Sequence, residues 1–146
     1  MGSIVEKASA FKTEIAVNSQ TLTSSDVNGA VIDLQGFNSV FFVVNVGANG
    51  GTLDGSNNVT FVLQEGDLSN GSDMADVTST NLTGGFAIDA NGVFATVDAG
   101  GEAETAYKVA YTGIKRYVRL QADVTGTISL PVGATALKGD GFKPQS

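Results

Sequence analysis

The chain of 146 residues contains no cysteine, no histidine and no tryptophan. Without cysteine it has no disulfide and no thiolate nucleophile, and without histidine it lacks the commonest general base and the ordinary zinc ligands. Neither a Gly-x-x-x-x-Gly-Lys-Ser/Thr phosphate loop nor a Gly-x-Gly-x-x-Gly fingerprint occurs. A carboxylate pair for sugar hydrolysis is the one catalytic device left, but the 15 acidic residues fall mostly in turns, where carboxylates are ordinarily solvated. We therefore expect a protein that is not an enzyme and binds no cofactor.

Long apolar runs are absent too. No segment approaches the roughly 18 consecutive apolar residues of a membrane span. Residues 1–7 do not combine a basic region with a following apolar one, as a secretory signal does. We expect no membrane association and synthesis in the cytoplasm.

Basic residues are missing from most of the chain. From Thr13 to Tyr107 there is no lysine or arginine but twelve acidic residues, and all eight basic residues lie toward the two ends; the net charge is −7. Two interpretations remain open: the C-terminal strands lie beside the acidic ones and neutralise them, or the basic ends dock on another subunit. The acidic excess argues against nucleic-acid binding.

The segment from Gly36 to Gly47 is the strongest strand signal. Side chains alternate between the faces of a strand, so one face of this segment carries Val40, Phe42, Val44 and Val46, and the other carries Phe41 and Val43. Because both faces are apolar, we expect this strand to be central and covered on both sides.

Further strands are predicted from alternating or apolar runs separated by glycine-rich turns. In residues 12–17 we expect Ile15 and Val17 to point inward and Lys12, Glu14 and Ala16 outward. We expect residues 59–65 to pair antiparallel with the central strand. The remaining predicted strands cover residues 29–34, 86–88, 93–97, 106–111, 115–124, 127–130 and 132–137, with Pro131 at a bend or an edge.

The sequence therefore predicts an all-β protein, a single-domain antiparallel β-sandwich or jelly roll of about eight to ten strands. Residues 1–11 form an N-terminal arm, residues 12–138 the β-sandwich domain and residues 139–146 a C-terminal tail.

Two acidic turns contain side-chain oxygens of the kind that bind calcium. They carry Asp67, Asn70, Asp73 and Asp76 in one and Asp89 with Asn91 in the other. Neither matches a twelve-residue calcium loop, and Asp, Asn and Gly are the usual residues of turns. We predict no metal site.

The basic cluster at residues 115–119 lies in a predicted strand. Alternation places Lys115, Tyr117 and Arg119 on one face and Arg116, Val118 and Leu120 on the other. These basic groups either pair with carboxylates on neighbouring strands or contact another subunit. The candidate contact residues of the whole chain are its basic residues outside the acidic middle and the aromatic residues of its ends, namely Lys7, Phe11, Lys12, Lys115, Arg116, Arg119, Lys138, Phe142 and Lys143.

Three segments, Gly36–Gly47, Val59–Asp67 and Val109–Arg119, together resemble small structural proteins of tailed bacteriophages, most of all head decoration (cement) proteins. The similarity extends over roughly residues 28–137. The chain departs from that pattern in having no tryptophan after the acidic turn.

The resemblance implies a virion protein on the capsid exterior that binds the outer surface of the major capsid protein lattice and stabilises the head. It also implies that the protein is a homo-oligomer, specifically a trimer. Two other functions stay open: a tail or head–tail connector component, and a carbohydrate-binding β-sandwich, for which three tyrosines offer few aromatic platforms.

Overall fold

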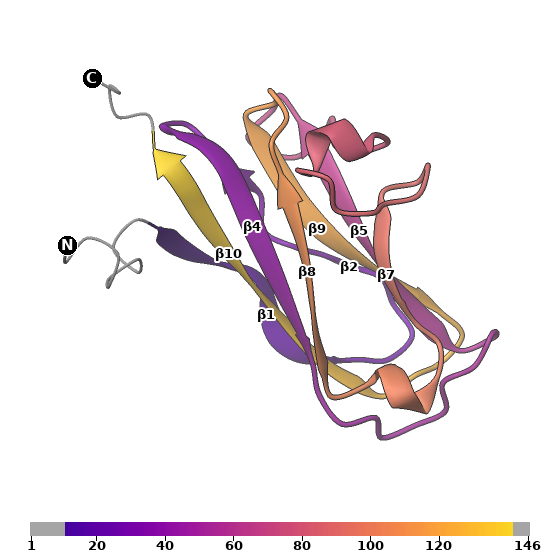
Figure 1. Cartoon of the computed structure of the whole chain (residues 1–146). Helices are drawn as coiled ribbons and strands as arrows, with labels where there is room; N and C mark the ends of the chain where they lie inside the picture. The colour runs from indigo at the N-terminus through magenta and orange to yellow at the C-terminus, as the bar shows by residue number, and fades with distance from the viewer. Residues whose placement is uncertain (1–10, 142–146) are drawn as a thin grey trace.

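The computed structural model describes residues 11–141, without the side chains of Asn81 and Asp140, and they form two antiparallel sheets around one core (Figure 1). The first sheet has the order β1–β10–β4–β8, with bounds Lys12–Leu22, Leu130–Gly141, Phe37–Val46 and Thr105–Tyr111. At the centre of the second lie β9 (Tyr117–Thr125) and β5 (Asn58–Gly66). The short strands β2 (Val27–Asn28) and β3 (Ile32–Asp33) flank β9, and β6 (Ala75–Asp76) and β7 (Val93–Val97) flank β5.

Helical structure is limited to two single turns of 3₁₀-helix, η3 (Thr80–Leu82) and η4 (Gly100–Glu102), and no α-helix occurs in residues 11–141. Consequently, no helix in this range is long and apolar enough to cross a membrane. The all-β prediction is confirmed.

The core follows the period of two in the strands. The inward side chains of β4 are almost fully buried, with Phe42 at 0% exposure and Val46 at 4%. They face buried residues of the other sheet, such as Phe61 of β5 and Leu120 of β9, within one hydrophobic cluster. As predicted, β4 is a central strand, between β10 and β8.

The prediction that β4 is covered on both sides holds only in part. Its outward side chains Phe41 and Val43 are half-buried, and the ring of Phe86 lies 6.3 Å from that of Phe41. The predicted pairing of residues 59–65 with β4 is wrong, because β5 belongs to the other sheet. The connection of residues 47–57 is longer than the two to five residues of a β-hairpin loop and carries the chain across to that sheet.

The predicted orientation of β1 is wrong for Ile15 and Ala16, whereas Val17 is buried and Lys12 is exposed as expected. Ile15 is 59% exposed, whereas Ala16 and Val17 are both buried. Register shifts between Ile15 and Val17 and between Val17 and Gln20 show that β1 is bulged, and a bulge interrupts the alternation of side chains. The sequence pattern cannot register such an extra residue.

Other expected strands change in length. The segment of residues 29–34 contains only the short strand β3. At Gly29, before this strand, the chain passes close to the backbone of β1 and β9. A Cβ atom on Gly29 would lie 2.5 Å from the carbonyl oxygen of Ala16 and 2.7 Å from that of Leu120. Residues 86–88 form no strand. β10 is continuous from Leu130 past Lys138 to Gly141, so Pro131 lies near the start of an inner strand rather than at a bend or an edge.

Candidate functional site: the outer faces and the corner of the chain ends

Lys115 and Arg116, the part of the basic cluster that precedes β9, bind side chains of the same chain. Lys115 Nζ lies 2.6 Å from Asp67 Oδ2. Arg116 donates two hydrogen bonds to Asp33, of 2.8 and 2.9 Å, and one of 2.6 Å to Gln35. These bonds from Arg116 lower the pKa of Asp33 to about 2. The interpretation that the C-terminal basic groups neutralise the acidic part of the chain is confirmed for both residues.

Arg119 belongs to a polar network on the outer side of the six-stranded sheet. Its Nε donates to Gln64 Oε1 at 2.8 Å, and the Gln64 amide donates to Asp76 at 2.9 Å. Gln121 donates to Asn28 at 2.8 Å. We call this surface, made by Asn28, Gln64, Asp76, Arg119 and Gln121, the polar face. Its side chains satisfy one another or meet water, as on a solvated sheet surface.

Lys138 lies inside the fold. Its side chain is 6% exposed, its Nζ is 2.5 Å from Glu14 Oε2, and it donates to the carbonyl oxygen of Asp33 at 2.9 Å. The same ammonium group lies 5.0 Å from the centre of the Phe37 ring. We therefore leave Lys138 out of the contact surfaces proposed below.

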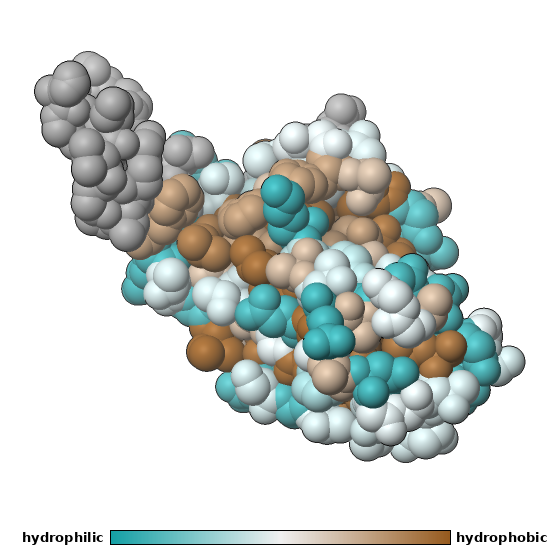
Figure 2. Space-filling model, turned by 60° about the horizontal axis from the view of Figure 1, so that its bottom comes forward, coloured by the Kyte–Doolittle hydropathy of each residue, from teal (hydrophilic) through white to brown (hydrophobic). Residues whose placement is uncertain are grey.

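The outer side of the four-stranded sheet differs in chemistry from the polar face. Two registered rows of side chains cross it, one through Leu137 and Phe41 and one through Ile15 and Val43. Phe86 adds its ring from the loop before β7. We call the surface of Ile15, Phe41, Val43, Phe86 and Leu137 the apolar face, and Figure 2 shows apolar residues gathered at the upper left of the described part.

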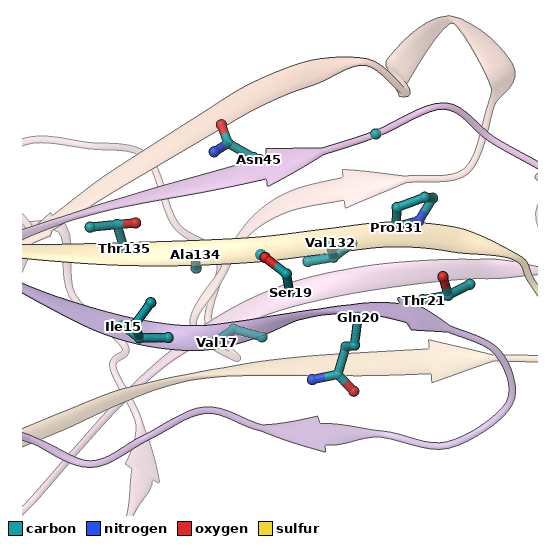
Figure 3. A pocket seen from close by; sticks show the side chains of 12 residues that line it. Ile15, Val17, Ser19, Gln20, Thr21, Asn45, Pro131, Val132, Ala134 and Thr135 are labelled. Carbon is teal, nitrogen blue, oxygen red and sulfur yellow. The ribbon is translucent and has the colours of Figure 1, made fainter.

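A trough opens at one end of the apolar face, over β1, β10 and β4 (Figure 3). It has a volume of about 420 Å³, and Ile15, Asn45, Pro131 and Thr135 are among the residues around it. Gly133 lowers its floor, since a Cβ atom there would lie 2.9 Å from Ser19 Oγ. None of the described residues that line the trough carries a charge.

Both ends of the described chain meet at one corner of the same sheet (Figure 1). β1 and β10 pair antiparallel, and Lys12 lies opposite Lys138. Phe11, 43% exposed, packs its ring over Gly139, where a Cβ atom would lie 2.7 Å from it. The other predicted contact residues of the ends, Lys7, Phe142 and Lys143, lie outside the described residues.

Sequence reasoning missed the most exposed large apolar side chain of residues 11–141. Ile114, in the turn between β8 and β9, is 97% exposed. It borders a groove of about 510 Å³ that Leu34 and Phe37 also line, with Lys115 and Arg116 at its side. An isoleucine after a glycine in a short turn is the only signal that the sequence offered for it.

Carboxylates of the acidic turns accept hydrogen bonds from backbone N–H groups of the same turns. Asp73 accepts hydrogen bonds from the backbone N–H groups of Asp67 and Leu68, which lower the pKa of its carboxyl group. Asp89 accepts from those of Asn91 and Val93. Among the acidic side chains that the structure describes, no three gather in a group that could hold a metal ion.

Comparisons with known proteins give no family for these surfaces. Neither a protein-family model nor a curated protein sequence matches the chain.

Proposed function

We propose first that the two sheets form a jelly-roll β-sandwich. Counting the short strands beside β9 as one and those beside β5 as one leaves eight strands. In chain order β1, β4, β8 and β10 belong to the four-stranded sheet and the other four to its partner. A double sheet of eight strands is the composition of the jelly roll, an architecture found in viral capsid and lectin domains.

We propose that the protein is a non-enzymatic capsid decoration, or cement, protein of a tailed bacteriophage. In this function it binds the outer surface of the major capsid protein lattice and stabilises the head. The observation that carries the proposal is the pairing of β1 with β10, which delivers both ends of the chain to one corner beside Phe11 and Lys12. The assignment to a phage virion rests on the resemblance of three segments to phage structural proteins.

The corner has the chemistry of a protein anchor. Lys12 is exposed and has no ion pair among the described residues, and Phe11 offers an aromatic ring that is partly free. Lys7, Phe142 and Lys143 add two cations and a second aromatic residue to the segments that start there. A shell surface that presents carboxylates around an apolar recess fits this set, because the aromatic ring supplies buried area and the lysines supply steering.

The same arrangement gives each end of the chain a role in avidity. Each segment alone contributes a few contacts, but copies repeated on a lattice bind cooperatively through their linkage. The polar face, on the other sheet, is suited to face solvent, since its side chains already bond to one another.

Truncation of the two ends tests this proposal. We expect removal of residues 1–10 and of residues 142–146 to lower occupancy on shells that lack the protein, while circular dichroism and the unfolding midpoint stay unchanged. The second boundary spares Gly141, which pairs with Phe37 in the sheet. Full occupancy after both deletions would refute the anchoring role of the corner. Binding confined to the portal axis would favour a head–tail connector instead.

A further inference from the structure

We infer that the apolar face is an interface between two copies of this chain, related by a two-fold axis. This contact goes beyond the proposed function, since it needs no shell and gives a two-fold pair in place of the trimer that the resemblance implies. The apolar face adjoins the corner of the chain ends, where Phe11 lies over Gly139 of β10. The argument rests on the shape, size and charge of the face.

The shape of the face is complementary to itself. At one end Phe41 and Leu137 lie opposite each other in register and form a ridge, with the ring of Phe86 beside Phe41. At the other end Gly133 lies at the floor of the trough. Along β10 the order is Leu137, Thr135, Gly133, so ridge and trough are separated by one outward residue.

A two-fold axis brings ridge and trough together twice. With the axis between the facing sheets, perpendicular to β10 at Thr135, the ridge of each copy enters the trough of the other. Such an isologous contact satisfies both copies with one surface patch. The trough suits this occupant because about 420 Å³ is open there and the lining residues within 11–141 are all uncharged.

The face is large enough for a stable pair. Four strands about 4.8 Å apart and a length of about 30 Å along β10 give about 550 Å² on each copy, or about 1,100 Å² in all. A biological interface needs about 1,000 Å² in total, so a contact over this whole side of the sheet reaches that size.

Charge enters the contact at one position on the edge strand. Among the described residues Lys108 is the one charged side chain that projects from this side of the sheet, as its alternation with the buried Val109 indicates. It lies on β8, at the margin, and its ammonium group is 6.0 Å from the centre of the Phe86 ring. Lys108 lies in the same row as Val43 and Thr135, so the axis brings the two Lys108 residues of a pair near each other at the edge of the sheet. Because each ammonium group leans toward Phe86, the two groups lie on opposite sides of the axis.

The first test is the mass of the intact chain in solution, measured by sedimentation. We expect a dimer, with twice the 14.9 kDa of one chain. Ile15→Glu puts a charge into the contact at a position that is 59% exposed, so the fold tolerates it, and we expect the dissociation constant to rise on the order of 100-fold or more. Thr96→Glu, on an exposed position of the other sheet, is the matched control and should remain dimeric.

Crosslinking tests the position of the axis. Because the chain has no cysteine, Thr135→Cys introduces a single thiol, which we expect a short bis-maleimide to join to its counterpart in a dimer. Thr96→Cys should give no more linked product than random collision. Equal crosslinking of the two variants would overturn the two-fold contact. So would sedimentation that shows the wild type as a monomer at about 100 µM, or as a trimer. A variant without residues 1–10 should still dimerise, and a monomer there would assign the association to the chain ends instead.

Discussion

The ammonium group of Lys138 lies 2.5 Å from a carboxylate oxygen of Glu14, and this ion pair joins β10 to β1 at the corner where the chain ends meet. The lysine side chain is 6% exposed and the glutamate side chain 32%. The pair therefore ties the edge strand to the sheet from the inside, where water screens it little.

Loss of the glutamate should loosen this corner. Glu14→Ala leaves the buried Lys138 ammonium with the carbonyl oxygen of Asp33 and the ring of Phe37 but without a carboxylate, and we expect the free energy of unfolding to fall by about 1–3 kcal/mol. Urea unfolding measures the change. Thr13→Ala, an exposed neighbour in the same strand, controls for strand propensity and should change stability by less than about 0.5 kcal/mol. An equal effect of both substitutions would contradict the role of the ion pair.

From the Arg116–Asp33 pair we predict that the stability of the fold decreases at acidic pH. The pKa of Asp33 is lowered from 3.8 to about 2, so the folded state favours the ionised carboxyl group. Its stabilisation is present above about pH 4 and is lost as the pH falls toward 2. Because both side chains are more than 40% exposed, solvent limits the gain to about 1 kcal/mol or less.

The comparison that isolates this effect is wild type against Asp33→Asn. We expect the wild type to be more stable at pH 6 and the two proteins to converge near pH 2 in urea titrations. A difference that persists unchanged at pH 2 would show that the loop, rather than the charge, accounts for it.

The hydroxyl group of Tyr111 predicts the opposite dependence, at high pH. This buried hydroxyl donates to Glu65 at 2.5 Å and accepts from the backbone N–H of Lys115 at 3.1 Å. Burial and the bond to Glu65 raise the pKa of Tyr111, so its stabilisation is complete below pH 10 and declines as the pH rises above it. We expect Tyr111→Phe to cost about 1–2 kcal/mol at pH 7 and less above pH 10. Thermal or urea unfolding at both pH values measures this, and a constant difference would argue against it.

Gly29 predicts a steric effect. Gly29→Ala would place its methyl group against two backbone oxygen atoms, of Ala16 and Leu120, which cannot move aside as a side chain does. We expect a loss of about 1–3 kcal/mol. Gly55→Ala is the control, since nothing lies within 4 Å of its added Cβ atom. A stability of Gly29→Ala equal to that of the control would mean that β1 and β9 are not held this close.

The strands could be predicted from the sequence where a period of two is uninterrupted. The alternation around Phe42 indicated both a central strand and its buried face. The orientation of Ile15 could not be predicted, because a bulge reverses the alternation without leaving a mark in residue types. Sheet membership of β5 was missed because pairing between distant strands depends on where the whole chain packs.

The candidate surfaces were predictable only in part. Phe11 and Lys12 stood out as an aromatic and a cation at the start of a strand, but their meeting with the other chain end depends on the pairing of β1 and β10. Lys138 looked like a surface cation, and the structure places it in the interior. The trough at Gly133 arises from a glycine and a bulge on neighbouring strands, so it has no local sequence signal.

Cryo-electron microscopy of the purified particle that contains this protein tests the central claim most directly. Decoration of the shell predicts density for a double-sheeted body at lattice positions on the outside of the head, with the corner of Phe11 and Lys12 toward the shell. Density confined to the tail or portal, or none on the particle, would contradict it.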